Sequence, residues 1–175
     1  MYYRSMNDAE LLAVVDENDV PLLPLSRAEV SERGLWARSA YVWIVNDSGQ
    51  ILCHQRSFAK PRNGGKWNGH FGGYGRGGEE YTDTALREVR EEIGLDLSPE
   101  SLHLYLIQRY EFHHTFQGVF TTKWSGNAND LKLQRDEVAQ VMWLTPAQIR
   151  KQPTDEWVSF GYEEQLLQEI EQNRF

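Results

Sequence analysis

The sequence has a single cysteine, Cys53, and no apolar run long enough to cross a bilayer. One cysteine excludes an intramolecular disulfide, and its place in the apolar stretch ILC favours burial as a small hydrophobic residue. The longest apolar stretches, at 11–15 and 41–45, fall far short of the roughly 20 residues that a transmembrane helix needs. We therefore expect a protein of the reducing cytoplasm that does not enter a membrane.

Basic charge is also scarce, because 18 Lys and Arg residues face 26 Asp and Glu residues and leave a net charge of −8. Proteins that bind nucleic acid usually carry a basic patch that releases counterions from phosphates, so a nucleic-acid partner is not expected. Residues 1–12 mix charge and polarity where a secretory signal has a basic and then an apolar region, so export is not expected either. The length of 175 residues suits one core, and we predict a single domain over 1–175.

Turn residues and apolar periodicity divide the chain into strands and helices. They predict a small hairpin at about 11–24, two strands flanking the turn at 46–49, and a glycine-rich loop at 57–78. Further along they predict two strands within 101–124, a helix after Thr145, and a C-terminal helix at about 156–172. Strands mixed with a few helices indicate an α/β or α+β layered domain.

The helix predicted at 82–93 has two different faces. Thr82 or Asp83 would cap its start, and apolar residues of the segment share one side. Glu88, Glu91 and Glu92 share the other side, where they repel one another unless a positive charge lies among them. A divalent cation would remove that repulsion, although a pair of glutamates on a helix is more commonly just a solvated face.

The stretch GYGRGGEEYTDTALREVREEIGL, from Gly73 to Leu95, resembles the Nudix box at every position that the box specifies. The surrounding segments resemble bacterial Nudix proteins related to isopentenyl diphosphate isomerase. This resemblance implies one Nudix domain with an α/β/α sandwich, a mixed β-sheet, and a loop–helix–loop at 73–95. It further implies an Mg²⁺-dependent hydrolase, with Mn²⁺ as an alternative ion, that cleaves a diphosphate linkage in a small molecule.

The resemblance also implies roles for individual residues of the box. Glu88, Glu91 and Glu92 would bind the metal and take part in catalysis. Glu79 and Arg87 would support the site by fixing the carboxylates, and Gly94 would end the helix in a left-handed turn.

Three residues outside or at the edge of the helix complete the expected site. Gly73 and Arg56 would contact the substrate, with Arg56 facing its phosphates. Glu137, with Asp136 behind it, is the candidate for an additional catalytic acid from a later loop. The sequence does not decide whether Glu88, Glu92 or Glu137 is the general base.

Two rival functions must be weighed against hydrolysis. An isomerase would need a histidine where Ala37 stands, a cysteine at Gly72 and an acid near Thr115, and none of these is present. A Nudix domain that only binds nucleotides would usually have a degraded box, whereas this box is intact. Both rivals are therefore disfavoured.

The substrate is expected to be a nucleoside diphosphate or a nucleoside diphosphate linked to another group. Several aromatic side chains could stack on a base, although at strand spacing most such residues belong to a core. His113 and His114 are expected at a strand end on the surface, since magnesium disfavours imidazole. The chain could also form a homodimer. The aromatic set is Trp67, Phe71, Tyr74, Phe112, His113, His114 and Phe116.

Overall fold

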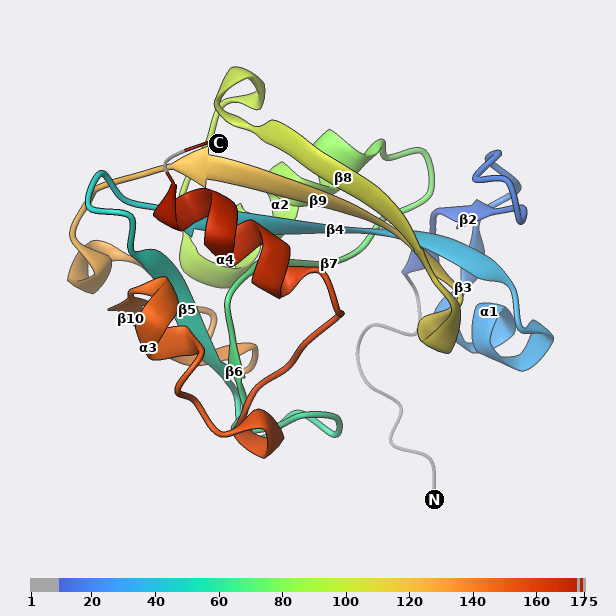
Figure 1. Cartoon of the computed structure of the whole chain (residues 1–175). Coiled ribbons are helices and arrows are strands. Elements are labelled where there is room, and N and C mark those ends of the chain that lie inside the picture. Colours follow the sequence, from blue (N-terminus) through green and yellow to red (C-terminus); the bar gives the residue numbers. More distant parts are fainter. Residues whose placement is uncertain (1–9, 173, 175) are drawn as a thin grey trace.

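The computed structural model describes residues 10–172 and 174 and contains a mixed, 8-stranded sheet with helices on both sides (Figure 1). Strands β4 and β9 run parallel to each other, and the other neighbouring pairs are antiparallel. The main strand order is β10 (Val138–Leu144), β5 (Ile51–Arg56), β4 (Trp36–Val45), β9 (Thr115–Lys123) and β8 (His103–Tyr110).

Strands β4 and β5 separate soon after the turn that joins them. They pair only through Val45 and Ile51, and the space beyond is filled by two short strands. Strand β6 (Trp67–Asn68) pairs with β5, and β7 (Phe71–Tyr74) pairs with β4. The glycine-rich segment, predicted as a loop, thus enters the sheet and lies next to helix α2 (Tyr81–Ile93).

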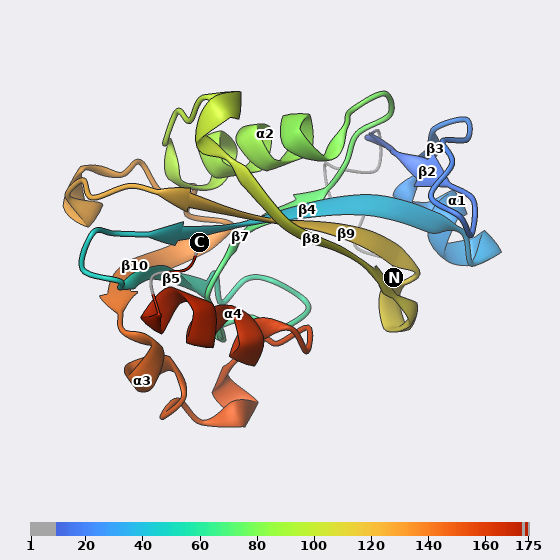
Figure 2. The same cartoon turned by 45° about the horizontal axis from the view of Figure 1, so that its top comes forward.

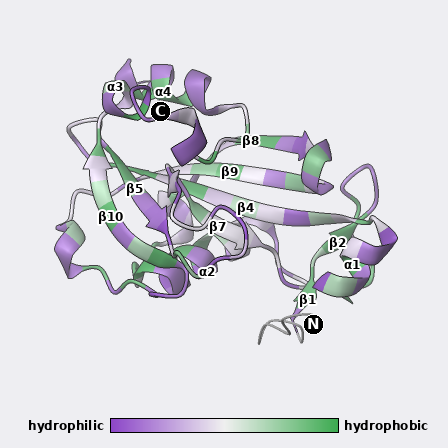
Figure 3. Cartoon of the chain, turned by 90° about the horizontal axis from the view of Figure 1, so that it is seen from below, coloured by the Kyte–Doolittle hydropathy of each residue, from purple (hydrophilic) through white to green (hydrophobic). Residues whose placement is uncertain are grey.

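Helix α2 covers one face of the sheet, whereas α3 (Pro146–Ile149) and α4 (Glu163–Glu171) cover the other (Figure 2). Strand β4 supplies both cores because its side chains alternate between the faces. Ile44 packs in the cluster that holds Val89 of α2, and Trp43 packs in the cluster that holds Leu166 of α4. The outer turns of α3 and α4 are hydrophilic (Figure 3). The predicted α/β/α sandwich is confirmed.

The helix ends depend on local residues. Gly94 ends α2 with φ 67°, in the left-handed conformation expected for it. The N-cap of α2 is Glu80, earlier than expected, because Asp83 at the third helical position completes a capping box with it. Thr145 caps α3 through its hydroxyl, which accepts a hydrogen bond from the Gln148 backbone.

Helix α4 begins at Glu163, and not near residue 156 as predicted. The chain before it forms the 3-10 turn η4 (Thr154–Glu156) and then bends at Gly161, where φ is 95°. This backbone conformation prevents the helix from extending further towards the N-terminus. Other 3-10 turns are η1 (Pro99–Ser101), η2 (Glu111–His113) and η3 (Ala128–Asp130).

The hairpin predicted at 11–24 is only partly present. The chain does reverse after Asp16, whose carboxylate accepts hydrogen bonds from the amides of Asn18 and Val20. However, β2 (Val14–Val15) pairs with β4, and β1 (Leu11–Leu12) pairs with β3 (Leu25–Ser26). Pro21 and Pro24 have no N–H groups to donate to a regular ladder. The expected pairing is therefore reduced to one isolated bridge, between Val15 and Pro21.

A short helix, α1 (Arg27–Arg33), follows β3. Among the residues that the structure describes, no helix has the length and apolar character needed to span a membrane. Residues 1–9, which include most of the segment used to predict the lack of an export signal, lie outside the described residues.

Candidate active site

A cavity of about 1130 Å³ opens beside α2, at the ends of β5 and β7 and next to the loop before β10. It brings together residues that are far apart in the sequence. Asp136 is exposed and does not line the cavity, whereas Glu137 does. The residues predicted for metal binding, catalysis, substrate contact at the phosphates and support of the site that line it are Arg56, Gly73, Arg87, Glu88, Glu91, Glu92 and Glu137; of the predicted aromatic set, Tyr74, Phe112, His113 and His114 line it as well.

Arg87 connects the loop of the box to its helix. The Nε and Nη2 atoms donate to the two carboxylate oxygens of Glu79 at 2.7 and 3.0 Å, and Nη2 also donates to the Tyr74 carbonyl. Burial alone would raise the pKa of Glu79, but hydrogen bonds from Arg87 and the Arg76 amide hold that pKa below its usual range. Glu79 and Arg87 therefore lie where a supporting role requires them.

The same guanidinium also neutralises part of the acidic face. Nη1 of Arg87 donates to Glu88 Oε1 at 2.7 Å and to Glu91 Oε2 at 3.1 Å. Glu91 is more exposed than Glu88 and pairs additionally with Arg76, at 3.1 Å. The repulsion predicted between the glutamates is thus relieved for Glu91 by two arginines.

Glu92 has less compensation. It is 7% exposed and accepts a hydrogen bond of 3.2 Å from the Gly72 amide. Burial raises the pKa of Glu92 well above its usual value, and the nearby carboxylates of Glu88 and Glu137 raise it further. Burial also raises the pKa of Glu88, despite Arg87. Ionised carboxylates are therefore disfavoured at the inner end of the acidic face, where a positive charge would stabilise them.

The donor chemistry of this cluster fits a divalent cation, but its arrangement is not that of a ready metal site. Among residues 10–172 and 174, no three His, Cys, Asp or Glu side chains are gathered as ligands of one ion. Glu88 and Glu91 instead point to Arg87, and Glu92 points to the Gly72 amide. The predicted convergence of three glutamates is therefore not formed, because the arginines hold two of them.

Two glycines bring the β7 backbone against its neighbours. A Cβ at Gly73 would lie 2.8 Å from Glu88 Oε1. At Gly72, where φ is 150°, a Cβ would lie 2.0 Å from the Ala40 carbonyl oxygen, so the cysteine of an isomerase has no room at this position. Ala37 packs in a core cluster with Leu12, and hence does not occupy the place of a cavity histidine.

Another part of the cavity wall is basic, through Arg56 and Lys60. Arg56, at the end of β5, has a buried Nε with no hydrogen-bond partner among the described residues. Lys60 forms an ion pair with Glu137, and the Ser57 amide donates to the Glu137 carbonyl at 2.8 Å. Lys60 was not predicted, because its proximity to Glu137 depends on the fold of the 57–66 loop.

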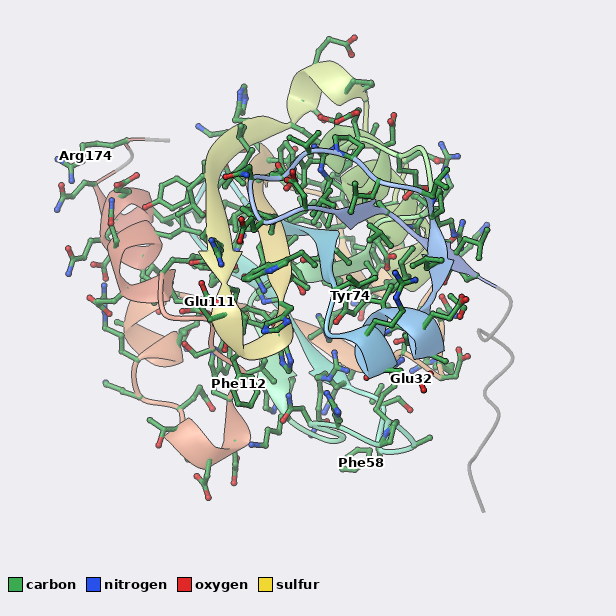
Figure 4. The ribbon with its side chains drawn as sticks, turned by 90° about the vertical axis from the view of Figure 1, so that its right-hand side faces the viewer. Glu32, Phe58, Tyr74, Glu111, Phe112 and Arg174 are labelled. Carbon is green, nitrogen blue, oxygen red and sulfur yellow. The ribbon has the colours of Figure 1, made fainter. Side chains whose placement is uncertain are left out.

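The fold places some of the aromatic residues proposed for substrate contact in the core and others at the cavity. Phe71 is fully buried in the core. Phe112, 81% exposed, lies at the turn between β8 and β9 and lines the cavity (Figure 4). His113 and His114 also line the cavity, and His114 stacks on Trp36 with ring centroids 4.9 Å apart. Sequence reasoning missed Tyr41, His54, His70 and Phe160, which line the cavity deeper inside.

The layered fold and the loop–helix–loop with its acidic side define the class of Nudix proteins, and sequence comparison agrees. The model of the NUDIX domain matches residues 35–166. An uncharacterized Nudix hydrolase of Pseudomonas aeruginosa is 33% identical over 83% of this chain and 85% of its own length. The chain therefore belongs to the Nudix family, and its family supports a hydrolase acting on pyrophosphate bonds.

Other relatives are less similar. The isopentenyl-diphosphate Delta-isomerase of Serratia proteamaculans is 29% identical over 67% of this chain and 70% of its own length. Among solved structures, DR0079 of Deinococcus radiodurans has a TM-score of 0.73 and 21% identity, covering 92% of this chain and 99% of that one. A MutT protein of Methanosarcina mazei has a TM-score of 0.60 and 22% identity, covering 78% and 93%. These structures support the fold.

Proposed function

We propose that this protein hydrolyses a diphosphate linkage in a nucleoside diphosphate derivative, with Mg²⁺ or Mn²⁺ as its cofactor. The observation that carries the proposal is one cavity lined by the mostly buried Glu88 and the buried Glu92 together with Glu137 and Arg56. A diphosphate brings negative charge to the basic wall, and a divalent cation brings positive charge to the acidic one. The two walls are thus complementary to a metal–diphosphate pair.

Glu88, Glu91 and Glu92 would hold the cation. When bound, it would neutralise phosphate oxygens and acidify a water molecule. To bind it, Glu88 and Glu91 would turn from Arg87, which keeps Glu79 as its partner. Through its pair with Glu79, Arg87 would hold the loop in place while Glu88 and Glu91 leave Arg87 and bind the cation.

The remaining residues would bind the diphosphate and move the proton. Arg56 would donate charge-assisted hydrogen bonds to phosphate oxygens through its guanidinium, whose Nε has no hydrogen-bond partner among the described residues. Glu137 is our choice for the general base, because it lines the cavity and is not among the three glutamates assigned to the cation. Lys60, its partner, would turn towards the added phosphate charge and free the Glu137 carboxylate.

A screen of diphosphate compounds tests the proposal. The purified protein would be incubated with nucleoside diphosphates, nucleotide sugars and dinucleoside polyphosphates, and phosphorus products would be followed by NMR. We expect turnover with Mg²⁺, loss of turnover with a chelator, and recovery when Mg²⁺ or Mn²⁺ is added back. Activity that survives complete chelation would contradict the metal assignment, and nucleotide binding without any turnover would favour a binding module. Location in the cytoplasm and a homodimer stay predictions.

A further inference from the structure

Two histidines lie in the inner part of the cavity. His54 and His70 are each 2% exposed, and both line the cavity. Nδ1 of His54 and both ring nitrogens of His70 have no hydrogen-bond partner among the residues that the structure describes. Buried polar atoms are nearly always hydrogen-bonded, so three such atoms at the wall of one cavity point to something that enters it.

Aromatic rings pack against both histidines, Phe71 against His54 and a second group against His70. The His70 ring lies 4.6 Å from that of Tyr41 and 5.2 Å from that of Phe160, and Phe160 lies 5.1 Å from Tyr41. The rings come from β4, from the connection between β6 and β7, and from the segment before α4. We call the set of Tyr41, His54, Asn68, His70 and Phe160 the aromatic pocket; all five line the cavity.

The aromatic pocket is uncharged, unlike the rest of the cavity. Burial lowers the pKa of His54 to about 3, and burial together with His54 and Arg56 lowers the pKa of His70 well below its usual value. A neutral imidazole has one N–H donor and one acceptor nitrogen. The two rings therefore offer both kinds of hydrogen bond to an uncharged group, and repel none by charge.

We propose that the aromatic pocket binds the nucleobase of the substrate, with its face against Phe160 and Tyr41 and its edge on His54 and His70. This inference rests on the proposed function, and it names the residues that select the group beyond the diphosphate. His54 precedes Arg56 by two residues on the same side of β5, about 7 Å away, so a base would adjoin the phosphate-binding arginine.

Other occupants fit the pocket less well. A hydrocarbon tail would leave the three ring nitrogens without hydrogen bonds, which costs free energy. A further phosphate would favour charged imidazoles, whereas these histidines are held neutral by burial. A planar heterocycle supplies both a face for the rings and an edge with donors and acceptors.

Calorimetry with base-containing and base-free probes tests the inference. The probes are ADP, GDP, CDP, UDP and inorganic pyrophosphate, each in Mg²⁺, on the wild type and on His70→Phe. We expect one nucleotide to bind at least about tenfold more tightly than pyrophosphate, and His70→Phe to remove about a factor of ten from this preference. Pyrophosphate binding should not change. The matched control is His103→Phe, on exposed β8, which should leave all affinities as they are.

A second measurement avoids dependence on the folding of the variant. In the wild type, the ring nitrogens of His54 and His70 should shift in ¹⁵N NMR spectra when the preferred nucleotide is added, and not when pyrophosphate is added. Equal binding of pyrophosphate and all four nucleotides, or unchanged ring signals, would show that water alone meets these histidines and would overturn the inference. Hydrolysis without any preference for a base would overturn the assignment of the aromatic pocket and leave the proposed function intact. Nucleotide binding that depends on the histidines, without hydrolysis, would support the aromatic pocket and overturn the proposed function.

Discussion

The guanidinium of Arg87 and the carboxylate of Glu79 form a two-pronged pair, with N–O distances of 2.7 and 3.0 Å. The pair joins the start of the Nudix box to its helix, and both side chains are mostly buried, at 14% and 18% exposed. Because Arg87 also contacts Glu88 and Glu91, one side chain sets both the loop and the resting positions of two proposed metal ligands.

Replacing Arg87 by alanine should destabilise the fold. Glu79 would be left as a mostly buried carboxylate without its counter-charge, which costs about 3 kcal/mol of unfolding free energy. Chemical denaturation would measure the loss. The matched control is Arg90→Ala on the same helix, where the Arg90–Asp96 pair is exposed and should add little. Equal losses in the two variants would contradict the supporting role of Arg87.

Glu92→Gln should separate stability from activity. The amide keeps the shape of the side chain and removes a buried charge that Glu88 and Glu137 oppose, so the Tm without metal should rise. Turnover should fall by about 100-fold or more, because a proposed ligand and its charge are lost. Glu88→Gln and Glu91→Gln should lower turnover similarly, and Glu100→Gln, on exposed η1, serves as the control. Full activity in the first three variants would refute the metal assignment.

Glu137 and its neighbour Asp136 allow a direct test of the general base. Glu137→Gln should reduce kcat by about 100-fold to 10,000-fold, the range for loss of a general base, with a small effect on KM. Asp136→Asn should leave kcat unchanged, because Asp136 is exposed and does not line the cavity. Steady-state kinetics on the substrate found in the screen would show the difference. A larger effect at Asp136 would mean that Asp136, and not Glu137, is the general base.

Local patterns in the sequence predicted what depends on neighbours along the chain. The apolar side of α2 and the stop at Gly94 follow from helical spacing and from the freedom of glycine, and both are present. The reversal after Asp16 is also local, but the partners of β1 and β2 are not, which is why the hairpin prediction was only partly right. Strand pairing is decided by packing across the whole sheet.

The site was predictable only where the motif is continuous. The Nudix box placed Glu88, Glu91 and Glu92 on one helix side, but it could not reveal that the Arg87 guanidinium binds two of them. The aromatic pocket was not predictable at all. His54, His70 and Phe160 come from three separate segments, and each has the composition of an ordinary core position.

The two buried histidines should make stability fall in acid. A neutral imidazole in the folded state has a lowered pKa, so between about pH 6.5 and pH 3 the unfolded state binds more protons, and unfolding is favoured as the pH falls. Each such histidine contributes up to about 1.4 kcal/mol per pH unit in this window. The raised pKa values of Glu88 and Glu92 act in the opposite direction, so the slope must be compared with that of a variant.

His54→Leu is that variant, since it keeps an apolar contact with Phe71 and removes one titrating group. Denaturation curves between pH 4 and pH 7 should show a shallower loss of stability in His54→Leu than in the wild type. Parallel pH profiles would mean that His54 is not held neutral in the folded protein.

Gly73→Ala should weaken metal binding without unfolding the protein. A Cβ there would lie 2.8 Å from the nearest carboxylate oxygen of Glu88, closer than van der Waals contact allows, so the carboxylate must shift. Gly73 does not have positive φ, and hence alanine adds no backbone strain. We expect the Mg²⁺ concentration for half-maximal turnover to rise about tenfold, the lower end of the effect of disturbing a ligand's surroundings, with a similar Tm. An unchanged Mg²⁺ requirement would show that Glu88 does not hold the ion.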